Sequence, residues 1–396
     1  MSNKSASSHL NLPIYLDYAA TSPVHPQVLE AMSPYFTEMY GNSASLYSLG
    51  LQSREAVDNA RSAVAKALNA SSGEIVFTSG GTESDNMAIR GAAQAKLSRG
   101  KHLLTTPIEH HAVLETMERL EHEGFEIEMI PVDCEGMIDL SEVEKRLRPD
   151  TTVVSVMHAN NEIGTILPIS EIGALCRAKG AIFHTDAVQT FGKIPIDVKA
   201  MSIDLLSISA HKLQGPKGVG ALYVRRGVTM TRFQDGGEQE KGRRGGTLNV
   251  PGIVGLGRAT ELAIANQLSE FERLSILREY FFRRISEDIS RTKVNGSRSS
   301  RLPMNVHVCI EGVHAETLLL SLDMAGICAS AGSACSSGSE DPSHVLKAIG
   351  MSSDSARSAL RMTIGASTTQ IQIDYVVDTL AKAVSDLRKM SASCLT

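Results

Sequence analysis

Residues 205–224 read LLSISAHKLQGPKGVGALYV, a polar segment enclosed by two apolar runs of strand length. The apolar runs predict buried strands at Leu205–Ser209 and Gly220–Val224, because short runs rich in branched residues are typical of a sheet covered on both faces. The segment between them carries His211 and Lys212, followed by a glycine-rich turn. We therefore expect polar side chains, one of them a lysine, at the end of a buried strand.

The same alternation of apolar strands and amphipathic helices extends from Glu74 to about Val250. It predicts an α/β domain with a mainly parallel central sheet. A long helix is expected from about Ile253 to Ile289. Further strands are expected at Ile75–Thr78, His102–Thr105, Glu126–Pro131, Val153–Met157 and Ile182–Thr185, with helices such as Glu83–Leu97 and Ile169–Lys179 between them.

A change of composition after the long helix predicts a second, smaller α+β domain. We expect residues 21–257 to form the large domain, and residues 1–20 with 258–396 to form the small one, which carries the Ser/Gly-rich loop 332–343. The last helix has an apolar stripe at helical spacing, which predicts a face packed on the small domain's sheet. Its members are Ile373, Val376, Val377, Leu380, Val384 and Leu387.

Composition is that of an ordinary globular protein, with 396 residues, 21% charged residues and a formal charge of -5. These values give no reason to expect nucleic acid as a direct partner. The apolar runs are far shorter than a membrane span, and Met1–Leu10 lacks the apolar core of a secretory signal. We therefore expect a cytoplasmic protein without a membrane anchor. The six cysteines are widely spaced and indicate neither a disulfide framework nor a metal site.

Residues 79–85, SGGTESD, lie between a predicted strand and a predicted helix. Glycines such as Gly81 let the backbone approach an anion, and a helix N-terminus favours phosphate. Thr82 is expected to cap this helix, with Asp85 in the capping-box position. An ordinary strand-to-helix turn explains the same residues equally well, so the motif alone does not decide the function.

Asp186, Gln189, Ser209, His211 and Lys212 follow the ends of two predicted strands. Ligands of open α/β sheets bind at these carboxyl ends, so the side chains are expected to converge on one crevice. A partly desolvated lysine can form a Schiff base with a carbonyl cofactor, and pyridoxal 5'-phosphate (PLP) also needs a carboxylate beside its pyridine nitrogen. The alternative for Lys212 is an ordinary surface lysine.

His110, Asn161 and Arg361 are further candidates at predicted strand ends or within a strand. His110 is suited to proton transfer near neutral pH and to lying over a cofactor ring, although a structural histidine is the commoner case. Asn161 is a ligand candidate or a loop-holding residue. Arg361 is an isolated cation in an apolar run and is suited to bind a substrate carboxylate with two hydrogen bonds.

Cys335 lies in the middle of the low-complexity segment GSACSSGSEDPS, residues 332–343. This segment lacks the apolar residues needed for packing and is expected to be mobile. A thiol on such a loop is suited to visit a substrate and then carry a group outward, whereas a structural cysteine has apolar neighbours.

The sequence resembles the group I cysteine desulfurases, the NifS/IscS-like branch of the fold-type I PLP enzymes. The stretches that carry the resemblance span nearly the whole chain, and the loop around Cys335 is the most specific of them. They are YLDYAATSPV, EIVFTSGGTESDN, EHHAVLET, MHANNEIGT, HTDAVQTFGKIPID, SAHKLQGPKGVGALYVRRG, RRGGTLNVPGIVG and SAGSACSSGSEDPSHVL.

The resemblance implies a role for each matching residue. Lys212 would hold PLP covalently, Asp186 would face its pyridinium and Gln189 its hydroxyl, with His110 as the stacked acid/base. Asn161 and Arg361 would bind L-cysteine, and Cys335 would receive its sulfur as a persulfide. Residues matching the phosphate cup are Gly81, Thr82, Ser209, His211 and, from the other subunit of a homodimer, Thr247.

The resemblance also implies that sulfur passes to an acceptor protein, either an iron-sulfur scaffold or a tRNA-thiolation enzyme. Two positions depart from the family pattern: Tyr47 stands where a histidine is usual, and Ala366 where an arginine is frequent. A selenocysteine lyase, a PLP aminotransferase and a non-catalytic partner protein on the same fold remain as alternatives.

Overall fold

The computed structural model describes residues 12–332 and 342–393. Its centre is a seven-stranded sheet with the order β2-β8-β7-β6-β5-β3-β4. Pairing is parallel from β7 to β4, whereas β8 runs antiparallel to both of its neighbours. The predicted mainly parallel sheet is confirmed. The strands are β2 (Ile75–Thr78), β3 (His102–Thr105), β4 (Glu126–Met129), β5 (Thr151–Ser155), β6 (Ile182–Asp186), β7 (Leu205–Ser209) and β8 (Gly220–Val224).

Four of these seven strands begin and end where the apolar runs predicted, and β6 includes one further residue, Asp186; the other two differ by two residues. The strand expected at Val153–Met157 is β5, which begins and ends two residues earlier. The chain leaves the ladder at Val156, whose N–H still donates to the His184 carbonyl. The strand expected at Glu126–Pro131 ends at Met129, since Pro131 has no N–H to offer a ladder.

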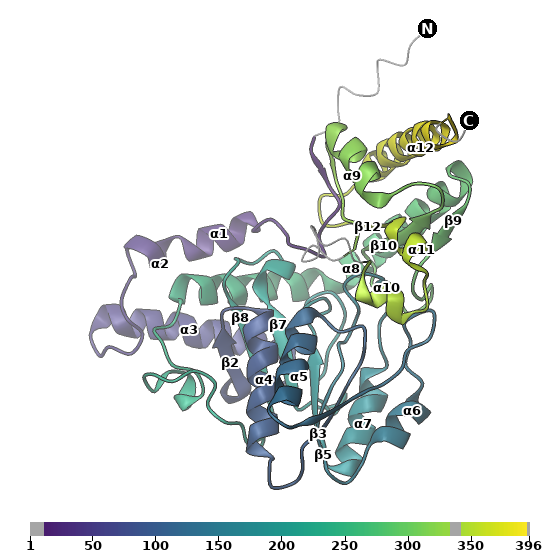
Figure 1. The fold of residues 1–396 in the computed structure, drawn as a ribbon. Helices are drawn as coiled ribbons and strands as arrows, with labels where there is room; N and C mark the ends of the chain where they lie inside the picture. The colour runs from purple at the N-terminus through teal and green to yellow at the C-terminus, as the bar shows by residue number, and fades with distance from the viewer. Residues whose placement is uncertain (1–11, 333–341, 394–396) are drawn as a thin grey trace.

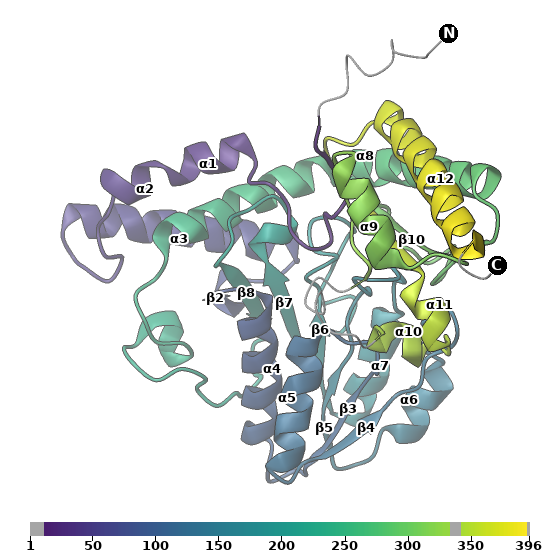
Figure 2. The ribbon, with the colours of Figure 1, turned by 45° about the horizontal axis from the view of Figure 1, so that its top comes forward.

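Helices cover both faces of the sheet, as expected for strands that are apolar throughout. Figures 1 and 2 show α4 (Gly81–Ala95) and α5 (His111–His122) side by side on one face. The opposite face packs against the remaining large helices in a continuous apolar core. These helices are α1 (Pro26–Met32), α3 (Ser48–Ala67), α6 (Leu140–Arg146), α7 (Ile169–Lys179) and the first part of α8 (Val250–Asp288).

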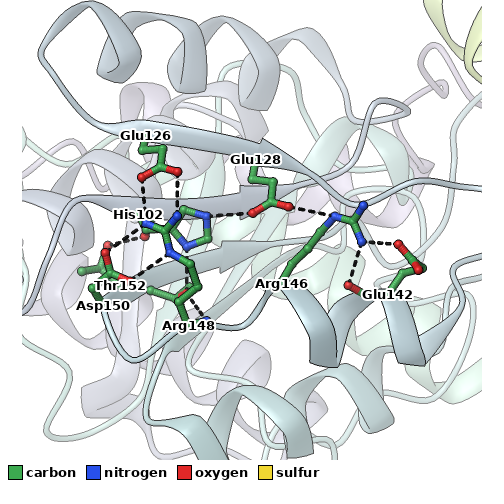
Figure 3. Close-up of polar contacts among 9 residues, drawn as sticks. His102, Glu126, Glu128, Glu142, Arg146, Arg148, Asp150 and Thr152 are labelled. Atoms are coloured by element: carbon green, nitrogen blue, oxygen red, sulfur yellow. Dashed lines mark hydrogen bonds and ion pairs between the residues drawn. The ribbon is translucent and has the colours of Figure 1, made fainter.

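The edge strand β4 carries charged side chains that are paired with neighbouring elements (Figure 3). Glu126 Oε1 accepts from Arg148 Nη1 at 2.6 Å, and Glu128 lies 3.1 Å from Arg146 Nε. Glu128 Oε2 is also 3.3 Å from Nε2 of the buried His102 on β3. Charged residues on an edge strand discourage pairing with another chain, so this network protects the sheet edge.

The chain beyond α8, together with the N-terminal strand β1, builds a second, smaller group of elements, gathered at one end of the molecule in Figure 1. A three-stranded sheet has the order β12-β10-β9, and β1 pairs with β11 in a separate two-stranded sheet. The stripe on the last helix packs into this core, as predicted. The elements are β1 (Ile14–Tyr15), β9 (Thr292–Val294), β10 (Asn305–Ile310), α9 (Ala315–Met324), β11 (Ile327–Cys328), α10 (His344–Ala348), α11 (Ser353–Arg357), β12 (Ala359–Thr363) and α12 (Gln370–Ser393).

The N-terminal segment joins the two groups of elements. Its strand β1 pairs with β11, Asp17 forms a bridge with Thr363, and the Ser22 N–H donates to the His211 carbonyl of the large sheet's loop. The expected division at residues 20/21 and 257/258 stays a prediction. Within the described residues, no helix is long and apolar enough to cross a membrane.

Candidate active site

A cavity of about 250 Å³ lies at the carboxyl ends of the central strands. Every predicted site residue other than Thr247 and Cys335 lines it, although these residues are spread over more than half of the chain. The structure therefore brings these residues together around one cavity, as their positions at strand ends predicted. The lining residues that were predicted are Gly81, Thr82, His110, Asn161, Asp186, Gln189, Ser209, His211, Lys212 and Arg361.

One end of this cavity is formed by the start of α4. The backbone at Gly80 has φ +154°, and a Cβ on Gly81 would meet Val188 Cγ2 at 2.8 Å, so a side chain at Gly81 would have to displace the wall. Thr82, Ser209 and His211 line both this cavity and an adjoining one of about 390 Å³. Backbone N–H groups of a helix start and hydroxyls gathered here are a donor set suited to a phosphate.

The expected capping role of Thr82 is wrong. The cap of α4 is Gly80, which offers no side chain, and Thr82 already lies inside the helix. The Glu83 side chain makes a hydrogen bond at this helix start instead: its Oε2 accepts from the Ser79 N–H at 2.8 Å. Asp85 is not in a capping box either: it is buried against the sheet. Thr82 is thereby free to face the cavity.

Asp186 ends β6 and is a buried residue of the cavity wall. Its Oδ1 accepts from the Val188 N–H at 2.8 Å. Burial raises the pKa of Asp186 to about 6, while the Val188 N–H and the Lys212 ammonium oppose that rise. At neutral pH Asp186 is therefore mainly a carboxylate, and a cation placed above it would hold it ionised.

Two further buried carboxyl groups lie behind Asp186. Burial and the charge of Asp186 raise the pKa of Asp85 well above its ordinary value, and burial raises that of Glu109 to about 8. His184 Nε2 lies 3.5 Å from Asp85 Oδ1, and burial lowers the pKa of His184 to about 3. Glu109 and His184 are thus neutral near pH 7, whereas Asp186 is mainly ionised. Burial and the charge of Asp186 make Asp85 harder to ionise than an ordinary aspartate.

Lys212 lies on a single helical turn, Ala210–Lys212, directly after β7. Its Nζ donates to the carbonyl oxygens of Ala19 at 2.5 Å and Ala20 at 2.7 Å. Gln189 Nε2 donates to the same Ala19 carbonyl at 2.9 Å, and Gln189 Oε1 is buried with no partner among the residues that the structure describes. The cavity therefore contains the Lys212 amine, whose position is fixed by hydrogen bonds, and Gln189 Oε1, which can accept a hydrogen bond from a ligand.

His110 is the N-cap residue of α5. Its Nδ1 accepts from the Ala112 N–H at 3.1 Å, so the proton of the neutral imidazole is on Nε2. Burial, Lys212 and the neighbouring histidines lower the pKa of His110 to about 4. The ring is therefore neutral at physiological pH and can both donate and accept a proton as charges in the cavity change.

Arg361 lies on β12 and is fully buried. Its Nη2 donates to Asp17 Oδ1 at 2.8 Å and its Nη1 to the Asn161 carbonyl at 3.1 Å. Arg361 Nε has no partner among the described residues. The guanidinium is thus held in a fixed orientation at the cavity wall, which suits it to bind a carboxylate.

Two predicted site residues are not part of this cavity. Thr247 is exposed and lies away from it within one chain. Cys335 is in residues 333–341, outside the described residues. The described residues on both sides of that segment meet at one side chain: Ser343 Oγ donates to Glu162 Oε2 at 2.6 Å, and a Cβ on Gly332 would lie 3.0 Å from the same oxygen.

Sequence reasoning gave no role to Asp17 or Glu109, and it gave Asp85 a capping role that the structure does not have. Asp17 lies in the stretch YLDYAATSPV, which was recognised as a motif without a role for its acid. Glu109 immediately precedes His110, and its Oε1 accepts from Thr106 and from the Met157 N–H. Acidic residues within apolar stretches were the available signal, since burying a charge is costly unless the group is paired or neutral.

The residues present fit PLP. Asp186 offers a carboxylate for a pyridinium, Gln189 Oε1 an acceptor for a hydroxyl, and Lys212 an amine for an aldehyde. The glycine-lined start of α4 gives a phosphate a close approach to backbone N–H groups. The orphaned Gln189 acceptor supports this fit most directly, because a buried polar atom without a partner is rare in a folded protein.

Comparisons with known proteins give the same result. The aminotransferase class-V family model matches residues 14–376. The cysteine desulfurase IscS of Clostridium botulinum is 52% identical over 384 residues, 96% of this chain and 97% of that protein. The cysteine desulfurase IscS of Dictyoglomus turgidum is 50% identical over 378 residues, 96% of each chain.

Solved structures agree in fold over most of the chain. A NifS-like protein has a TM-score of 0.89 at 37% identity, covering 94% of this chain and 100% of that one. SspA in complex with cysteine has a TM-score of 0.80 at 38% identity, covering 89% and 98%. The chain therefore belongs to the class-V aminotransferase family, and within that family to the cysteine desulfurases. The expected fold-type I architecture is confirmed.

Proposed function

We propose that this chain removes sulfur from L-cysteine with PLP as its cofactor, releasing L-alanine and holding the sulfur as a persulfide on Cys335. The observation that carries the proposal is that Lys212, Asp186 and Arg361, which come from distant parts of the sequence, line one cavity. Lys212 supplies an amine for the cofactor, Asp186 a counter-ion for it, and Arg361 a guanidinium that can bind a carboxylate. PLP, when bound, supplies an electron sink for the bonds of the substrate Cα.

The residues of the chain divide the remaining work. Arg361 binds the substrate carboxylate, with its orientation fixed by Asp17 and the Asn161 carbonyl. The Lys212 amine, which lines the cavity, would take the Cα proton of the substrate and return a proton later. His110 is neutral with its proton on Nε2, so it moves protons close to the substrate without adding a permanent charge.

Sulfur transfer is assigned to Cys335 from the sequence. The Cys335 thiolate forms a bond to the substrate sulfur while the substrate Cβ–S bond breaks. The electron pair of the broken bond stays with the carbon fragment, which takes up protons and leaves as alanine. The meeting of Gly332 and Ser343 at Glu162 supports this assignment, because Glu162 directly follows the cavity residue Asn161.

Further parts of the proposal concern assembly and location. We place Thr247 in the phosphate site of a partner subunit, which makes the protein a homodimer with shared sites. Its exposure supports that placement, because Thr247 does not line the cavity of its own chain. The acceptor is an iron-sulfur scaffold or a tRNA-thiolation enzyme, and the location is the cytoplasm.

Mass spectrometry of the chain incubated with L-cysteine tests the proposal. The peptide that contains Cys335 should gain one sulfur atom, about 32 Da. The Cys335→Ala variant should keep the cofactor spectrum, because Lys212 and Asp186 are unchanged, and should form no persulfide and almost no alanine. The matched Cys134→Ala variant, at an exposed cysteine, should behave like the parent.

Three results would count against the proposal. Normal alanine production by Cys335→Ala would indicate direct release of sulfur or selenium from the substrate, as in a selenocysteine lyase. Amino-group transfer without sulfur release would indicate an aminotransferase. Absence of any visible absorption band after incubation with PLP would indicate a non-catalytic protein on the same fold.

A further inference from the structure

A second cavity, of about 290 Å³, lies on the other side of Lys212 from the candidate active site. It is bounded by α8, by the connection between β6 and β7, and by the chain that follows β12. Lys212 lines both cavities, so a molecule in the second one would contact the stem of the proposed cofactor lysine. None of the roles described above uses this space.

Two buried hydrogen-bond donors in this cavity have no partner among the described residues. They are Nζ of Lys193, which follows β6, and Nε2 of Gln267, on α8. Buried polar atoms are almost always hydrogen-bonded, and an unpaired donor costs about 1–3 kcal/mol. The two donors come from different elements but line the same cavity, so an acceptor group of one bound ligand would account for both.

The other residues that line the cavity limit the kind of ligand that can carry this acceptor. Most of them are apolar, with Leu213, Leu262, Ala263, Phe271, Leu274, Met304 and Ile364 among the lining residues. Glu270 is the one carboxylate among the described lining residues, and both of its oxygens accept from Arg273. An ammonium group would find no free carboxylate here, so the wall disfavours amino acids. A multiply charged anion would face a single unpaired cation in apolar surroundings and would be poorly solvated.

We propose that this cavity binds a small organic monocarboxylate with an apolar chain, whose carboxylate accepts from Lys193 Nζ and Gln267 Nε2. The apolar chain then lies along the α8 side chains. Such a ligand would stand against Lys212 and would regulate the adjacent site. The binding itself does not depend on the proposed desulfurase activity, so the two can fail separately.

Protonation of Lys193 supports the choice of an anion. Burial and the nearby Lys212 lower the pKa of Lys193 to about 7. A bound carboxylate favours the charged form, so binding should be coupled to uptake of a proton by Lys193. The other titratable groups that line the cavity are Tyr18, His25, Lys212 and Glu270.

Hexanoate is a suitable probe, and ligand-observed NMR on the PLP-loaded protein is a direct readout of binding. We expect a dissociation constant on the order of 1 mM near pH 6.5, which is typical of a ligand of this size. Above the pKa of Lys193 the affinity should fall by about tenfold per pH unit. The neutral 1-hexanol and the cationic hexylamine should bind at least about tenfold more weakly.

Variants distinguish the proposed site from unspecific binding. Lys193→Met keeps the apolar stem and removes the charge, and should weaken hexanoate binding by at least about tenfold. Gln267→Leu provides a second variant, expected to weaken it by about fivefold. The matched control is Lys199→Met, at an exposed lysine, which should bind as the parent does. Thermal unfolding shows whether each variant is folded.

The proposal is overturned if hexanoate shows no binding at about 10 mM, in which case Lys193 and Gln267 are merely hydrated. It is also overturned if folded Lys193→Met and Gln267→Leu bind hexanoate as tightly as the parent, or if hexanol competes equally. A loss of binding in both variants with normal binding in Lys199→Met supports it.

Discussion

Asp17 Oδ1 lies 2.8 Å from Arg361 Nη2, and the two residues are 344 positions apart in the chain. Arg361 is fully buried on β12, whereas Asp17 belongs to the N-terminal segment and its side chain is 18% exposed. The pair neutralises a cation that would otherwise be costly to bury at the cavity wall. It also fixes the orientation of a guanidinium that is proposed to bind the substrate carboxylate.

Replacing Asp17 by Ala should therefore affect both stability and substrate binding. We expect the free energy of unfolding to fall by about 2 kcal/mol, less than for a fully buried pair because water reaches Asp17. KM for L-cysteine should rise at least about fivefold, since Arg361 loses its fixed orientation. Asp354→Ala, which breaks an exposed pair with Arg357, is the control and should change neither quantity. Equal effects of the two substitutions would contradict the positioning role.

Replacing Arg361 by Lys should raise KM for L-cysteine by at least about tenfold, because lysine cannot offer two parallel N–H donors to a carboxylate. PLP binding should be unchanged, since the guanidinium is assigned to the substrate. Steady-state kinetics and the absorption spectrum with PLP measure the two effects. A variant with lost PLP binding and unchanged KM would move Arg361 to a cofactor role.

Replacing Asp186 by Asn should keep the cavity's shape and remove its charge. PLP should still bind, but kcat should fall by at least about a hundredfold, because a neutral amide does not hold the pyridine nitrogen protonated. The PLP content after gel filtration and the rate of alanine formation measure this separately. Unchanged turnover would remove Asp186 from the proposed mechanism.

The buried Glu109 makes stability depend on pH in a defined direction. Burial raises its pKa from an ordinary 4.5 to about 8, so the folded state keeps a proton that the unfolded state has already lost in this interval. Stability contributed by this group is therefore lost as pH rises towards 8. Glu109→Gln should gain stability relative to the parent as pH rises over that range, by roughly 4 kcal/mol in unfolding free energy.

Chemical denaturation of the parent and of Glu109→Gln at several pH values measures this difference. Glu118→Gln, at an exposed position on α5, serves as the control and should give a difference that does not vary with pH. A flat profile for Glu109→Gln would mean that Glu109 is ionised in the folded protein.

Replacing Thr247 by Val tests the shared site. If Thr247 reaches the phosphate in a partner subunit, PLP affinity should fall about tenfold, which corresponds to one hydrogen bond to a charged group. The chain should sediment as a dimer at micromolar concentration. Thr317→Val, on the exposed face of α9, should leave PLP affinity unchanged. An active monomer would contradict the assignment of Thr247.

The sequence predicted those features that are determined by residues close together in the chain. Lys212 and Asp186 each follow an apolar run, so the position of both at the carboxyl edge of a parallel sheet could be predicted from the run alone. The stripe on the last helix was predictable for the same reason, since its spacing fixes one face. Ser79–Asp85 is the counterexample: a capping box fits the sequence, but the helix is capped by Gly80, two residues earlier than a cap at Thr82 requires, and Gly81 packs closely against Val188.

Other features depend on contacts between distant parts of the chain. No local pattern joins Asp17 to Arg361, and none reveals that β8 runs against its neighbours, since an apolar run reads the same in both directions. The unpaired donors of Lys193 and Gln267 are likewise invisible in the sequence, because burial of single atoms depends on how α8 crosses the end of β6.

The place of the N-terminal segment has a consequence for biosynthesis. The carbonyl groups of Ala19 and Ala20 hold Lys212, but β1 finds its partner only at Ile327–Cys328, and Asp17 only at Thr363 and Arg361. On the ribosome, the first residues to emerge must wait for nearly the last before they acquire a fixed position. The large sheet can form earlier, but a growing chain cannot hold its lysine in the geometry of the finished protein until translation is almost complete.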